Sequence, residues 1–123
     1  MILKDSSVQF GLHHLLSRFL VECVDGWYRD SGSELVVTSG SEPEAVHSYG
    51  SKHYDRPGQA ADVRTWDEAT HGRGTVPTPY QQWIALGELA VQFCEANDLP
   101  TNCIDVVLEK THIHIELHFK GRD

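Results

Sequence analysis

The sequence predicts an α+β fold, in which an antiparallel sheet with a C-terminal β-hairpin is combined with two main helices. Two stretches, near residues 7–29 and 79–97, repeat apolar residues at the three- and four-residue steps of an amphipathic helix. The stretch 103–119 instead alternates apolar and polar residues, which is the period of a strand with one buried face. A chain of 123 residues is too short for two ordinary domains, so residues 1–123 are expected to form a single domain.

The first helix is expected over roughly 7–29. Ser6, followed by Gln9 three residues later, has the spacing of a capping box at a helix start. The buried stripe of this helix consists of Leu12, Leu15, Leu16, Phe19, Leu20, Cys23 and Trp27.

Two short strands flank a long loop. Residues Glu34 to Thr38 are largely apolar and β-branched and are followed by Ser39-Gly40, and residues Ala60 to Arg64 form a second short strand. Residues 41–59 between them carry prolines and glycines with little periodicity.

The second helix is expected from Pro79 to near Asn97. Thr78 supplies an N-cap, Pro79 suits the first helical position, and Gln81 completes a capping box. The apolar stripe of this helix consists of Trp83, Leu86, Ala90 and Phe93.

The C-terminal hairpin is expected to turn at Lys110-Thr111. Glu109 then lies opposite His112 on one face, with Cβ atoms about 4.5–5.5 Å apart. His114 follows on that face about 6.6 Å along the strand. Because the turn lacks an Asn-Gly type of sequence, a register shifted by one residue stays open as an alternative.

Composition excludes several classes of partner. Eighteen acidic and ten basic side chains give a net charge of -8, and the basic residues are scattered, so nucleic acid is not expected as a partner. The three cysteines lack Cys-x-x-Cys spacing and are expected to be reduced core residues. Neither an export signal nor a run of about 18 apolar residues is found, so we expect a chain made in the cytoplasm without a signal peptide and without a membrane partner.

The histidines and carboxylates predict a zinc site. His53 and Asp62 flank a junction between loop and strand, and His112 and His114 alternate on the last strand beside the carboxylate of Glu109. Zinc takes imidazole nitrogen and carboxylate oxygen at roughly 2.0–2.2 Å, and a catalytic site uses three protein ligands and leaves a fourth position for water. Two imidazoles and one carboxylate meet that requirement, with a further carboxylate as a base.

These residues resemble those of a known superfamily, the zinc peptidases that cleave D-amino-acid-containing peptides of bacterial cell walls, together with the hedgehog signalling domain that shares their fold. The pattern Ser-x-His-x-x-Gly-x-Ala-x-Asp is similar to the residues Ser51, His53, Gly58, Ala60 and Asp62. The segment 108–114, which ends in a His-x-His strand, resembles the corresponding hedgehog segment. The resemblance covers roughly residues 34–118 and is strongest to small phage and prophage members.

The resemblance implies a hedgehog-like fold and a Zn²⁺-dependent peptidase or amidase that acts on stem or cross-link peptides of peptidoglycan. His53, Asp62 and His114 would bind the metal, with Glu109 as the general base. His112 and His47 would stabilise the oxyanion. Relatives differ in which histidine of the last strand binds, so His112 remains the alternative ligand to His114.

Other side chains receive lesser roles. Asp105 and Glu116 are expected to orient the ligand imidazoles. No role is expected for His13, His14, His71 and His118. The implied partner is a cell-wall peptide, and the implied place of action is a phage virion or the cell wall, while the oligomeric state is left open.

Two departures from the family pattern favour a rival reading. Eight residues separate His53 from Asp62 where six are usual, and Ser41-Glu42-Pro43 occupies the place of an arginine that many of these peptidases carry. The rival is a catalytically inactive, zinc-stabilised binding or structural module of a virion. Retention of Glu109 favours the enzyme.

Overall fold

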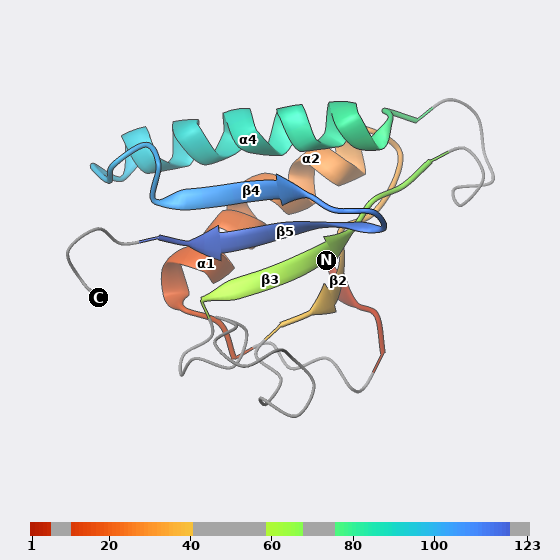
Figure 1. The fold of residues 1–123 in the computed structure, drawn as a ribbon, viewed down its shortest axis with the longest axis horizontal. Helices are drawn as coiled ribbons and strands as arrows, with labels where there is room; N and C mark the ends of the chain where they lie inside the picture. The colour runs from red at the N-terminus through yellow and green to blue at the C-terminus, as the bar shows by residue number, and fades with distance from the viewer. Residues whose placement is uncertain (6–10, 41–58, 68–75, 119–123) are drawn as a thin grey trace.

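The computed structural model describes residues 1–5, 11–40, 59–67 and 76–118, which form an α+β arrangement of one sheet and two helical stretches (Figure 1). The sheet has five strands in the order β1-β2-β3-β5-β4. Their bounds are Ile2–Leu3 for β1, Val36–Ser39 for β2, Ala60–Arg64 for β3, Ile104–Leu108 for β4 and His112–Leu117 for β5.

The sheet is mixed, so the predicted antiparallel sheet is confirmed for all of its strand pairs except one. β1 pairs in parallel with β2 through Ile2 with Val36 and Leu3 with Val37, and the other neighbours are antiparallel. A two-residue strand gives no periodic signal of its own, and its partner lies more than 30 residues away in the sequence. Only tertiary pairing makes it a strand.

The first helical stretch is shorter at its start than predicted. It consists of α1 (His14–Phe19), a π-helical segment η1 (Leu20–Val24) and α2 (Asp25–Asp30). The predicted capping residues Ser6 and Gln9 lie outside the described part of the chain. Instead, the side chain of His13 accepts a hydrogen bond from the backbone N–H of Leu15 at 3.2 Å and caps the helix about two turns later than predicted.

The second helix, α4 (Pro79–Ala96), confirms its prediction. The hydroxyl of Thr78 accepts from the Gln81 N–H at 3.1 Å, and the Gln81 side chain accepts from the Thr78 N–H at 2.9 Å. This reciprocal capping box satisfies two backbone donors that a helix start otherwise leaves unpaired.

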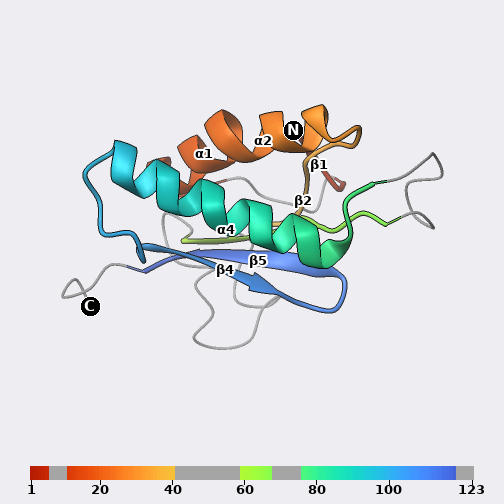
Figure 2. The same ribbon diagram turned by 90° about the horizontal axis from the view of Figure 1, so that it is seen from above.

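Both helical stretches cover the same face of the sheet, as the view from above shows (Figure 2). The core between the two layers contains fully buried Phe19 and Leu20 from the first stretch, Leu86 from α4, and Ile113 and Ile115 from β5. Burying an apolar side chain of this size contributes roughly 1.5–3 kcal/mol. The other face of β5 is consequently left to its alternating polar residues.

The hairpin register confirms the predicted two-residue turn. Leu108 pairs with Ile113, and the Glu109 N–H donates to the His112 carbonyl at 2.9 Å. The one-residue slip is therefore excluded, and Glu109 lies opposite His112.

Two of the three cysteines are core residues, as expected. Cys94 at the end of α4 and Cys103 before β4 are buried, with their Sγ atoms 3.1 Å apart, whereas Cys23 is half-buried. Burial and the neighbouring thiol raise the pKa of Cys103 to about 12, so its reactive thiolate form is rare at neutral pH.

Among the described helices, none is both long enough and apolar enough to cross a bilayer.

Candidate metal centre

The outward face of β3 and β5, opposite the helices, brings Asp62, His112 and His114 together. Antiparallel pairing places Asp62 opposite His114 and Arg64 opposite His112. Side chains alternate along a strand, and Ile113 is fully buried against the helices, so both histidines point to the other face. The pairing joins parts of the chain that are 52 residues apart.

One carboxylate oxygen faces both imidazoles. Oδ1 of Asp62 lies 2.8 Å from Nδ1 of His114 and 3.6 Å from Nε2 of His112. The side chains are partly shielded, with 14% of Asp62, 21% of His114 and 30% of His112 exposed. The site is therefore neither fully desolvated nor an open surface.

Asp62 is positioned from the β2 side by an irregularity in the sheet. The register between β2 and β3 shifts between Val37 and Ser39, and the Thr38 hydroxyl donates to the Asp62 carbonyl at 3.3 Å. Such a bulge changes the direction of nearby side chains and is frequent beside functional sites.

His114 is held through both ring nitrogens. Nε2 of His114 lies 3.1 Å from Oε1 of Glu116, which leaves the imidazole between two carboxylates. The hydrogen bond to Asp62 is the main cause that raises the pKa of His114 to about 9, with a further contribution from Glu116 and against the opposing effect of burial. A protonated His114 imidazolium can donate to both carboxylates.

The donor set also fits zinc. Two ligand atoms that share a tetrahedral zinc at about 2.0–2.1 Å are roughly 3.3 Å apart, and the Asp62 distances to His114 and His112 lie on either side of that value. A histidine bound through Nδ1 donates its Nε2 hydrogen to a second acceptor, which orients the ring. Glu116 occupies that position for His114, and this favours His114 over His112 as the ligand.

The remaining predicted site residues lie in two places. His53 and His47 lie outside the described residues. Glu109 is exposed at the end of the hairpin, on the face of its cross-strand neighbour His112.

A neighbouring group of potential ligands lies on the same face. Carboxylate or imidazole atoms of Asp105, Glu116 and His118 are all within 4.8 Å of one another. Asp105 faces Glu116 across β4 and β5, and Glu116 also contacts His114. His118, for which no role was expected, thus stands beside two carboxylates that were expected to orient ligands.

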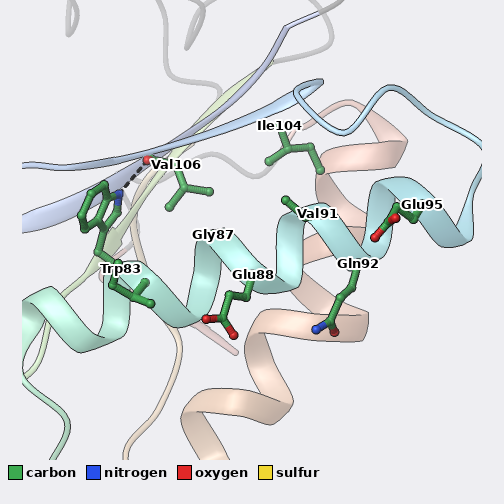
Figure 3. A pocket seen from close by; sticks show the side chains of 9 residues that line it. Trp83, Gly87, Glu88, Val91, Gln92, Glu95, Ile104 and Val106 are labelled. Carbon is green, nitrogen blue, oxygen red and sulfur yellow. Dashed lines mark hydrogen bonds between the residues drawn. The ribbon is translucent and has the colours of Figure 1, made fainter.

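A hollow of about 640 Å³ lies between α4 and β4 (Figure 3), and none of these histidines is among the residues that line it. Val91, Ile104 and Val106 give it apolar walls, with Glu88 and Glu95 among its lining residues. The indole N–H of Trp83 donates to the Val106 carbonyl at 2.8 Å. This bond occupies an acceptor on the outermost strand of the sheet and reduces the capacity of that edge to pair with another strand.

Sequence reasoning did not identify Gln82 as a structural residue. Its buried side chain accepts hydrogen bonds from Tyr28 at 3.2 Å and from the Trp66 N–H at 3.1 Å, and it donates to the carbonyls of Trp66 and Pro77. A polar residue inside the apolar stripe of α4 was the one signal available, because a buried amide needs partners.

The comparisons found no match for this chain among protein-family models, curated proteins or solved structures. Its function therefore has to be inferred from its own residues.

Proposed function

We propose that this chain is a zinc-dependent peptidase or amidase with a hedgehog or D-Ala-D-Ala peptidase type of fold, acting on stem or cross-link peptides of peptidoglycan. The observation that carries the proposal is the Asp62 carboxylate facing two imidazoles, at 2.8 Å for His114 and 3.6 Å for His112. Asp62 and His114 hold the zinc together with His53, which lies outside the described residues.

The chemistry requires a base and an oxyanion donor beside the metal ligands. When bound, zinc lowers the pKa of its water towards about 7 and polarises a scissile carbonyl. Glu109 accepts a proton from the attacking water and passes it to the leaving amine. Its cross-strand neighbour His112 donates to the developing oxyanion, a task shared with His47.

The rival function is a zinc-stabilised binding or virion module without catalysis. It is favoured by the sequence Ser41-Glu42-Pro43 in the place of the family arginine and by the longer spacing between His53 and Asp62. Both candidate functions require bound zinc. They are therefore distinguished only by whether the protein cleaves the cell-wall peptide.

Purified sacculi distinguish the two functions. The parent protein should release free amino groups in a chelator-sensitive reaction. Glu109→Gln should reduce that release by at least about a hundredfold, because general-base assistance contributes about 10²–10⁴ in rate. Its zinc content should equal that of the parent.

Glu88→Gln on the exposed surface of α4 is the matched control, because it removes one carboxylate far from the histidines. If sacculi of several wall types bind the parent protein and release no amine, the peptidase is rejected and the binding module replaces it.

A further inference from the structure

Cys94 and Cys103 form a buried pair of thiols where α4 leads through a short connection into β4 (Figure 1). Their Sγ atoms lie 3.1 Å apart. Cys94 belongs to the last turn of α4, and Cys103 directly precedes β4. The third cysteine, Cys23 on η1, is half-buried and makes no hydrogen bond to either sulfur atom of the pair in the described part of the chain.

The backbone fixes both residues of the pair. The Cys94 carbonyl accepts a hydrogen bond from the Leu99 N–H at 2.9 Å. The Cys103 N–H donates to the Pro100 carbonyl at 3.0 Å, and the Cys103 carbonyl accepts from the His118 N–H at 2.7 Å. The folded chain thus holds the two sulfur atoms together, so a bond between them requires little further ordering of the backbone.

A covalent bond between these sulfur atoms is within geometric reach. A disulfide has an S–S length of about 2.05 Å, so the two atoms need to approach by about 1 Å from their distance of 3.1 Å. A buried cysteine is often only a small apolar core residue. Direct contact of two sulfur atoms distinguishes this pair from a cysteine that only fills space.

We propose that Cys94 and Cys103 form a reversible disulfide when the protein meets a small-molecule disulfide such as oxidised glutathione, and that this bond ties the end of α4 to the start of β4. The proposal does not depend on the proposed peptidase.

The reaction is a thiol–disulfide exchange in two steps. The thiolate of one cysteine attacks a sulfur atom of the oxidant, which forms a mixed disulfide and releases one glutathione thiolate. The thiolate of the other cysteine attacks the cysteine sulfur of the mixed disulfide, forms the bond between Cys94 and Cys103, and releases the second glutathione thiolate. The two cysteine protons end on the released thiolates, so two cysteines are oxidised and one molecule of oxidised glutathione is reduced.

Burial should make this reaction slow in the fully folded protein. Both sulfur atoms are hidden from solvent, and burial with the neighbouring thiol raises the pKa of Cys103 to about 12, which keeps its thiolate scarce. The connecting segment 95–102 lies largely on the surface, and local opening of such a segment costs less free energy than global unfolding. Oxidation should therefore become faster in urea at concentrations below the unfolding transition.

Mass spectrometry tests the pairing. Cys23→Ala is the matched control, because it removes the cysteine outside the pair. After incubation with oxidised glutathione in dilute urea, this variant should lose two hydrogen atoms and carry no glutathione. Adding Cys94→Ala or Cys103→Ala should abolish that loss, because the remaining thiol can only stay free or bind glutathione.

The parent protein gives a test that needs no variant. Proteolytic cleavage after Glu95 or Asp98 should leave Cys94 and Cys103 in fragments that stay joined until a dithiol reductant is added. The oxidised protein should unfold at a temperature about 10 °C higher than the reduced protein, because the bond links residues nine apart and restricts the unfolded chain.

Joined fragments together with the higher unfolding temperature support the proposal. Glutathione adducts without an internal bond, or an oxidised protein that unfolds at or below the temperature of the reduced protein, would overturn it.

Discussion

His114 determines how the outward face of the sheet responds to protons. Its ring lies between Asp62, 2.8 Å from Nδ1, and Glu116, 3.1 Å from Nε2. The two carboxylates raise its pKa from 6.5 to about 9, so the folded protein retains this proton over a range in which the unfolded chain has lost it. A proton on His114 and a zinc ion at the candidate site would therefore compete as partners of the Asp62 carboxylate.

The stability of the metal-free protein should depend on pH through His114. The raised pKa stabilises the folded state fully below about pH 6.5, and this contribution should disappear as the pH rises through about 9. Urea denaturation with chelator, repeated between pH 6 and 9.5, should show a larger loss for the parent than for His114→Gln.

His14→Gln, an exposed histidine on α1, is the control and should follow the parent. With zinc bound the sign should reverse, because ligand imidazoles must be neutral and acid expels the metal. Identical pH profiles for parent and His114→Gln would contradict this role of His114.

At the scale of elements, local sequence patterns predicted α4 and the hairpin. The strand β1, which forms by pairing with a distant part of the chain, was not predicted. The Thr78 capping box and the alternation from Ile104 to Leu117 each depend on neighbouring residues. The parallel pairing of β1 depends on distant ones. The start of the first helix was wrong because the capping-box spacing occurs by chance more readily than a whole periodic stripe.

In the candidate metal site, too, local patterns predicted some of the neighbouring residues and non-local pairing determines the others. The hairpin pattern predicted that Glu109, His112 and His114 share a face, and the register confirms it. The sequence analysis expected Asp62 and His114 to share a metal, but it did not predict that they are cross-strand neighbours on β3 and β5, because no local pattern encodes that pairing.

Among the described polar residues that connect one helix or strand to another, Gln82 should be the one whose substitution lowers the stability of the fold most. It joins α4 to Tyr28 of α2 and to Trp66 and Pro77, which lie on either side of residues 68–75. Gln82→Leu leaves several buried groups without partners, so the free energy of unfolding should fall by roughly 2–4 kcal/mol.

Chemical denaturation of Gln82→Leu measures this loss. Gln92→Leu makes the same substitution at an exposed position of α4 and should change stability by less than about 0.5 kcal/mol. Similar stabilities for both variants would show that the bonds of Gln82 are replaced by water.

At the scale of the whole molecule, the described helices and the candidate metal ligands lie on opposite faces of one sheet. The helices bury the apolar side chains of β5, while its histidines and Glu116 face the other way with Asp62 and Asp105. The net charge of -8 adds a general attraction for cations. Two groups on this face, Asp62 with His112 and His114, and Asp105 with Glu116 and His118, are candidates for the same ion.

Zinc should raise the unfolding temperature of the whole chain, with close to one equivalent retained after dialysis. A ligand that binds only the folded state at a hundredfold excess over its Kd stabilises by about 2.7 kcal/mol, which for a domain of this size is roughly 10 °C. In Asp62→Ala and in His114→Ala, differential scanning calorimetry should show no zinc-dependent rise of the unfolding temperature. Elemental analysis of the same variants should show that the zinc is not retained.

His118→Ala and His112→Ala decide the assignment of ligands. His118→Ala should keep the zinc, because it alters only the group around Asp105. His112→Ala should also keep the zinc and lose rate alone, since Glu116 orients His114 and not His112 as the ligand. Loss of zinc in His112→Ala with retention in His114→Ala would move the third ligand to His112. Loss in His118→Ala with retention in Asp62→Ala would move the metal to the Asp105 group and remove the basis of the proposed peptidase.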